Sequence, residues 1–141
     1  DRAQDRRRGF ETALLGAGMT PDPELCVETT LDLTGGAQAM AGLLARSSRI
    51  RAVFCYSDVL AAGAHFECQR RDIPIPDGMA IAGYDDLEIA RQITPALTTL
   101  RVPCYEIGQR AGQLICRRLA GELVEEKIIN TGFELIVRES T

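Results

Sequence analysis

The chain has 141 residues, of which 45% are hydrophobic and 26% are charged, a composition typical of one soluble globular domain. Its formal net charge of −4 argues against nucleic-acid binding by this chain itself, because neutralising phosphates requires a basic surface. No apolar run approaches the ~20 residues that a membrane span requires, and the charged N-terminal stretch shows no signal-peptide pattern. We therefore expect no membrane partner.

The cysteines give a first indication of the cellular compartment. They are Cys26, Cys55, Cys68, Cys104 and Cys116. Their number is odd, none forms a C-x-x-C pair, and Cys55 and Cys104 stand in apolar surroundings. We expect reduced, buried thiols in a cytoplasmic protein rather than disulfides or a metal site.

The first third of the chain predicts two helices separated by a short strand. Apolar residues recur at helical spacing within 1–18, which predicts an amphipathic helix that begins some residues after the start of this range. Gly18 is a residue type that commonly ends a helix. A strand is expected at 25–29, a loop at 31–36 and a second helix at 37–46.

The middle of the chain predicts a strand–helix–strand unit. Two short apolar runs, 52–55 and 79–83, flank a helix of small residues at 59–71. Such a unit is parallel with a right-handed crossover, and ligands bind beyond the carboxyl ends of its strands. Those ends are Ser57-Asp58 and Asp85-Asp86.

The last third predicts a helical turn at 87–92, an extended segment at 94–101, a helix at 104–120 and closing strands at 127–130 and 133–137. Strands and helices alternate along the whole chain. The expected fold class is therefore α/β with a mainly parallel sheet.

Five segments carry a family resemblance, and their order makes the set specific although each is modest alone. They read DRRRGF (5–10), AVFCYSDVLAAGA (52–64), IPDGMAIAGYDD (75–86), TPALTTL (94–100) and ELIVREST (134–141). They resemble motifs of the effector domain of the LacI/GalR family of bacterial transcriptional repressors.

The resemblance implies a parallel-sheet sandwich of the periplasmic-binding-protein-like type I, represented mainly by its C-terminal lobe. Residues 1–96 and 130–141 would belong to that lobe and 97–129 to the N-terminal lobe, with the helix-turn-helix headpiece absent. The chain would then be a fragment. The apolar face of the helix at 104–120 would need a partner, so we expect a homodimer or a swapped arrangement.

The resemblance also assigns effector-binding residues. It puts the effector-contacting carboxylate at Asp85, although an Asx turn or helix cap is the alternative for that residue. Arg6 matches the family's arginine, whose planar guanidinium can bind hydroxyl groups or a carboxylate through two N–H groups. The alternative is that Arg6 is one of several solvated arginines at the helix end. Ser57 stands where relatives have Asn and is a further effector-binding candidate, with helix capping as the alternative for its single hydroxyl. Leu33 stands where relatives often place an aromatic ring.

Other residues have weaker assignments. Ala62 and Ile93 match parts of the family's dimer interface, with close packing inside one lobe as the alternative for the small-residue helix. His65 stands alone and is expected to be structural or solvent-facing. The adjacent Asp85 and Asp86 could suggest a metal or acid–base pair, but no His or further carboxylate clusters with them in the sequence. We predict no metal ligands, no catalytic residues and no cofactor.

The sequence thus predicts a ligand-sensing fragment of a LacI-type regulator. A small effector, a sugar or sugar acid, would modulate operator DNA binding by a separate helix-turn-helix. The main alternative is a periplasmic sugar-binding protein of an ABC transporter. An enzyme is a more distant alternative, because no nucleophile–base set and no phosphate-binding loop occurs.

Overall fold

A four-stranded sheet forms the centre of the computed structural model, which describes residues 2–125 and 128–141. Its strands stand in the order β1 (Ala52–Phe54), β2 (Ala80–Tyr84), β3 (Thr98–Arg101) and β4 (Glu134–Ile136). The first three are parallel, and β4 runs antiparallel to β3. The prediction of an α/β fold with a mainly parallel sheet is confirmed.

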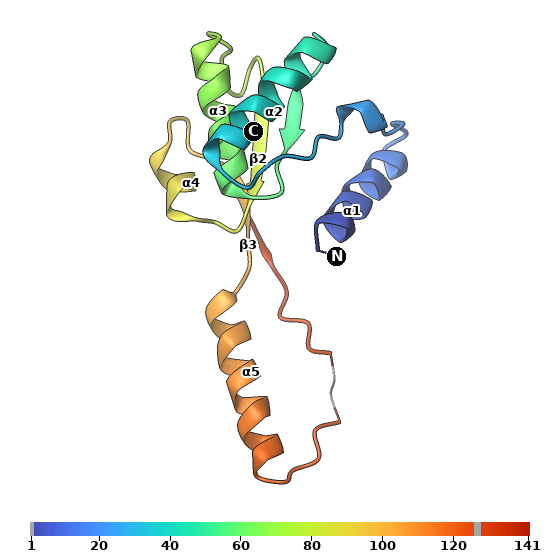
Figure 1. The fold of residues 1–141 in the computed structure, drawn as a ribbon, viewed down its shortest axis with the longest axis vertical. Coiled ribbons are helices and arrows are strands. Elements are labelled where there is room, and N and C mark those ends of the chain that lie inside the picture. The colour runs from blue at the N-terminus through green and yellow to red at the C-terminus, as the bar shows by residue number, and fades with distance from the viewer. Residues whose placement is uncertain (1, 126–127) are drawn as a thin grey trace.

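Helices surround this sheet. The helices α2 (Leu33–Arg46) and α3 (Asp58–Arg70) pack against each other, and α3 packs on β2 (Figure 1). The short helix α4 (Glu88–Gln92) packs on α3. The N-terminal helix α1 (Arg2–Gly16) lies beside the body, where the ring of Phe10 stacks on that of Phe54.

Two glycines allow α2 and α3 to approach closely. A Cβ atom at Gly36 would overlap the backbone of Leu60, and one at Gly63 would overlap the carbonyl oxygen of Leu33. The backbones therefore meet where any larger residue would hold them apart. The small-residue helix predicted in the sequence has its close neighbour inside this chain.

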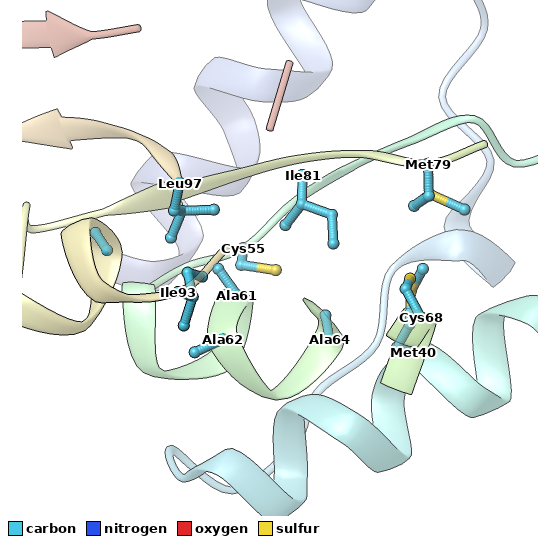
Figure 2. Close-up of a cluster of buried hydrophobic side chains, with 11 residues drawn as sticks. Met40, Cys55, Ala61, Ala62, Ala64, Cys68, Met79, Ile81, Ile93 and Leu97 are labelled. Carbon is cyan, nitrogen blue, oxygen red and sulfur yellow. The ribbon is translucent and has the colours of Figure 1, made fainter. Parts of the chain in front are cut away.

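The hydrophobic core fills the space between the sheet and these helices. Figure 2 shows side chains from α2, α3 and β2 converging with those that follow β1 and precede β3. The core cluster consists of Met40, Cys55, Ala61, Ala62, Ala64, Cys68, Met79, Ile81, Ala90, Ile93 and Leu97. It fixes the carboxyl ends of β1 and β2 relative to the helices, and these ends carry the candidate site.

An arm extends from the body beyond β3 and β4. It contains α5 (Cys104–Leu119), which ends before Gly121 at positive φ (82°), as the sequence predicts. No residue of α5 is buried. The predicted apolar stripe is open to solvent, with Ile107 41%, Ile115 61% and Leu119 84% exposed. Figure 1 shows the helix standing clear of the sheet.

Two predicted elements differ from the structure. The strand expected at 25–29 is wrong: Pro23–Leu25 is a 3₁₀ helix (η1), begun by Asp22, whose carboxylate accepts from the amide of Glu24. The helix expected at 37–46 starts at Leu33, because Asp32 caps it by accepting from the amide of Gly35 at 2.6 Å.

The closing part of the chain bears on two further expectations. In the strand expected at 127–130, residue 127 lies outside the described residues, and 128–130 form no strand. The segment 97–129, expected in the N-terminal lobe, starts inside this sheet: Leu97 is fully buried and β3 pairs with β2. The chain leaves the body only after Arg101. Among the helices of the described residues, none has the length and apolarity to cross a membrane.

Candidate functional site

The carboxyl ends of β1 and β2 bring three of the predicted site residues to one edge of the sheet. Because these strands are parallel, their ends meet at the same edge. Ser57 lies just beyond β1 and Asp85 directly follows β2. Arg6 reaches the same edge from α1, where its Nη1 donates to the carbonyl oxygen of Tyr56 at 2.8 Å.

Two aromatic rings hold the guanidinium of Arg6. Its Cζ atom lies 4.3 Å from the ring centroid of Tyr56 and 3.4 Å from that of Tyr84. Contacts of a cation with aromatic faces fix the plane of the guanidinium and leave N–H groups at its edge for other partners. Sequence reasoning missed both tyrosines. The available signal was an aromatic residue at the end of each strand, opposite an arginine on the first helix.

Among residues 2–125 and 128–141, the carboxylate of Asp85 has no hydrogen-bond or ion-pair partner. Its backbone has φ 109°, and Asp86 has φ 52°, both in the region that residues with a side chain rarely adopt. Such conformations cost ~1–3 kcal/mol each and persist only where the surroundings enforce them. The amide of Asp85 donates to Leu100 at 2.8 Å. Its half-buried carboxylate makes no hydrogen bond or ion pair within the described part of the chain, so it is available to a ligand.

Asp86 has the opposite surroundings. Its side chain is 2% exposed and accepts from Arg138 at 2.5 Å, from Arg101 at 2.7 Å and from Arg91 at 2.9 Å. Burial alone would raise the pKa of this carboxyl, but the hydrogen bonds from the arginines outweigh it and hold the pKa well below its usual range. Asp86 therefore remains ionised and is held by arginines, whereas no arginine pairs with Asp85 in the described part of the chain, so the two carboxylates have different roles.

Asp58 is a buried structural carboxylate beneath the site. It accepts from the hydroxyl of Thr99 at 2.6 Å and from the amide of Leu87 at 2.7 Å. Burial raises its pKa, and these hydrogen bonds oppose the rise. A Cβ atom at Gly83 would overlap this carboxylate, so the glycine makes room for it. Asp58 thus ties the turn after β1 to β2 and β3.

Ser57 and Leu33 have other partners in the structure. Ser57 is 4% exposed and its hydroxyl accepts from the amide of Val59 at 3.3 Å, the capping role considered in the sequence. Leu33 is 43% exposed and lines a groove of about 370 Å³ between α2 and α3, whose lining includes neither Arg6 nor Asp85. An effector contact by Ser57 or Leu33 stays a prediction.

Three further residues lie inside the body. Ala62 and Ile93, expected at a dimer interface, belong to the hydrophobic core. His65 is fully buried, and both of its ring nitrogens lack a hydrogen-bond partner among the described residues. Burial lowers the pKa of His65, which the nearby Pro95 carbonyl opposes only in part. The imidazole is therefore neutral at pH 7.

The cysteines divide into two groups. Burial raises the pKa of Cys55 to about 12 and that of Cys68 to about 11, so both are protonated and unreactive. The expectation of buried thiols is wrong for Cys26, Cys104 and Cys116, which are exposed. Within residues 2–125 and 128–141, no group of three or more His, Cys, Asp or Glu side chains could hold a metal ion.

Comparison with known proteins agrees with the fold. A sequence profile described as periplasmic binding protein-like domain matches residues 1–141. The ribose operon repressor of Haemophilus influenzae is 37% identical, with 99% of this chain and 40% of the relative covered. The repressor CytR of Escherichia coli K12 is 34% identical, with 96% and 40% covered. The chain thus spans about two-fifths of the length of these curated relatives.

Solved structures agree as well. The transcription regulator GntR from Chromobacterium violaceum superposes with a TM-score of 0.94 at 32% identity, with 99% of this chain and 52% of that chain covered. The regulator CelR, solved as a cellobiose complex, gives a TM-score of 0.91 at 32% identity, with 96% and 42% covered.

The fold is that of a periplasmic-binding-protein-like domain. The relatives above are transcription regulators rather than enzymes or transport proteins. The chain belongs to the LacI/GalR family, and it matches the periplasmic binding protein-like domain over its whole length.

Proposed function

We propose that this chain is the effector-sensing part of a bacterial LacI-type transcription regulator that acts in the cytoplasm. It binds a small sugar or sugar acid at the carboxyl ends of β1 and β2. One observation carries the proposal: a guanidinium held flat by two aromatic rings stands at the same strand edge as a carboxylate with no partner in the described chain. Arg6 donates hydrogen bonds and Asp85 accepts them, so together they match the hydroxyl groups of a sugar.

The mechanism is a shift between two lobe orientations. The segment that leaves the body after Arg101 and contains α5 packs in the N-terminal lobe, which covers the exposed stripe of this helix. An effector between the lobes favours one of their orientations. That orientation decides whether a separate helix-turn-helix can sit on operator DNA.

Calorimetry on the full-length regulator tests the site. The panel contains D-ribose, D-glucose, D-gluconate and cellobiose. Asp85→Asn removes the charged acceptor and weakens binding of the recognised sugar about 10- to 100-fold, the equivalent of ~1.5–3 kcal/mol for a hydrogen bond to a charged group. Asp77→Asn, at an exposed aspartate in a loop, is the matched control and leaves the affinity unchanged. Equal affinities of the two variants would contradict the proposal.

The ligand class within this proposal depends on Arg6. A guanidinium suits a carboxylate, while Ser57 offers fewer contacts than an amide, which together favour a sugar acid. Tighter binding of D-gluconate than of the neutral sugars supports this choice. Equal or tighter binding of a neutral sugar overturns it and leaves the sensor function standing.

The regulator also forms a homodimer through the groove between α2 and α3. Its lining includes the apolar side chains of Ala37, Ala41 and Phe66 beside Glu67 and Arg70, which form an ion pair with each other at 2.8 Å. A two-fold axis brings such a surface against a second copy of itself, where the apolar residues are buried and neither charge is left without its partner. Ala62 is buried on the same helix, α3.

A further inference from the structure

The arginine cluster around Asp86 plays no part in the proposed effector contacts, yet it adjoins them directly. The Asp86 side chain is 2% exposed and forms ion pairs with three arginines. They are Arg91 of α4, Arg101 at the end of β3 and Arg138 of the C-terminal segment. Arg138 also donates to the carbonyl oxygen of Leu97 at 2.7 Å, so its own place is fixed. The three ion pairs therefore hold Asp86 in a defined position.

The backbone at that position is strained, and Asp86 supplies its anchor. Asp85 and Asp86 both have positive φ, and nothing in the described chain holds the Asp85 side chain. The backbone therefore sets the direction of its Cα–Cβ bond, and with it the region that the carboxylate can reach. The amide of Asp86 lies 3.4 Å from the hydroxyl of Thr99, which is a weak contact. The ion pairs of Asp86 are the stronger restraint on the turn.

The same cluster reaches the base of the arm. Arg101 is the last residue of β3 and pairs with Glu134, the first residue of β4, at 2.9 Å. These strands connect the body to the arm that carries α5 (Figure 1). One arginine thus contacts Asp86 and the strand through which the chain returns from the arm.

We infer that Asp86 is a positioning residue of the effector site, which aims the Asp85 carboxylate and ties the site to the strands leading to the arm. The inference rests on the proposed effector contact of Asp85. Asp86 touches no ligand itself. It acts by holding a two-residue turn that would otherwise relax to an extended backbone.

A double-mutant cycle on the full-length regulator tests the inference, with the same four sugars as probes. Asp86→Asn keeps the shape of the side chain and weakens sugar affinity by at least about tenfold, as expected when a binding group is misplaced. In the background of Asp85→Asn, the same change has no further effect, because the group it positions is already lost. Asp77→Asn, the same change at an exposed aspartate outside the cluster, changes affinity less than about twofold.

A merely structural role for Asp86 gives a different result. It makes the Asp85→Asn and Asp86→Asn effects additive, or leaves Asp86→Asn equal to Asp77→Asn, and either outcome overturns the inference. If Asp86→Asn does not fold, Arg91→Gln replaces it. That variant removes one exposed donor, and loss of affinity that disappears in the Asp85→Asn background supports the inference.

Amide hydrogen exchange tests whether Asp86 holds the turn without the need for a bound sugar. The amide of Asp85 donates to Leu100 and is protected while the turn is held. Asp86→Asn speeds its exchange at least about tenfold relative to core amides of β2. Unchanged exchange overturns the inference. Failure of all four sugars to bind the wild type contradicts the proposed function, while the exchange result still decides the role of Asp86.

Discussion

His65 is an ionisable residue in a buried position that disfavours its protonated form. The side chain is fully buried on α3, and both nitrogens lack a partner in the described structure. The rings of His65 and Phe66 are nearly perpendicular, with the ring planes at 82°. A charged imidazolium here would lose its hydration, which lowers the pKa of His65, and the nearby Pro95 carbonyl offsets that loss only in part.

This burial predicts a pH-dependent stability. The unfolded chain binds a proton at His65 more readily than the folded chain, so the free energy of unfolding decreases as the pH falls through the unfolded pKa of ~6.5. We expect a loss of stability between pH 6.5 and 5.5, with an upper limit of about 1 kcal/mol set by the unfolded pKa, that is absent in His65→Leu. Urea unfolding of both proteins at these pH values measures the difference. Parallel pH dependence of the two would show that the folded state accepts the proton.

The site residues differ in how far sequence alone could identify them. Arg6 and Asp85 follow from short motifs, and the structure brings them to one strand edge. The tyrosines beside Arg6, and Arg101 and Arg138 on Asp86, do not follow from motifs, because these contacts join residues distant in the sequence. Arg138, for example, is 52 positions from Asp86. Only the folded sheet defines such neighbours.

At the scale of elements, the glycines of α2 and α3 set the distance between helices. Gly63→Ala forces a methyl group into the Leu33 carbonyl, and we expect it to cost ~1–3 kcal/mol of unfolding free energy. Gly108→Ala on α5 is the matched control. It meets open space and should be neutral or stabilising by up to ~1 kcal/mol, because alanine favours the helix.

Thermal and urea unfolding of the two alanine variants measure this contrast. A Gly63→Ala protein as stable as the wild type would mean that α2 and α3 can separate at little cost. It would also weaken the role of this contact in holding the strand ends in place.

Elements with a strong internal pattern were predictable, and those that depend on a neighbour were not. The helices α3 and α5 carry small-residue and amphipathic patterns, and their observed bounds lie within one residue of the predicted ones. The stretch 25–29 has the composition of a strand but no ladder partner, so it remains outside the sheet. The start of α2 depended on a capping hydrogen bond from Asp32.

At the scale of the whole molecule, two apolar surfaces stay uncovered by the described residues. The stripe of α5 is exposed along its length, and the α2–α3 groove is a second, separate surface on the body. The sequence predicted the stripe, because helical periodicity is local. It could not reveal the groove, which exists only once two helices separated by a strand pack together.

The two surfaces need different partners. The stripe belongs to the arm and is proposed to meet the N-terminal lobe of the same protein, while the groove is proposed to meet a second copy. Ala41→Glu places a charge among the apolar residues that line the groove. Burying this charge in the dimer is costly, so the variant should weaken dimerisation of the full-length regulator at least about tenfold. The helix itself should tolerate the change, because Ala and Glu both favour helices.

Sedimentation equilibrium measures the dimer dissociation constant of this variant beside that of Ala13→Glu, an equivalent change at an exposed alanine of α1. Weakening confined to Ala41→Glu assigns the groove to the dimer interface, because both variants gain the same charge and differ only in location. Equal dissociation constants in the two variants would instead place the dimer contact elsewhere on the protein.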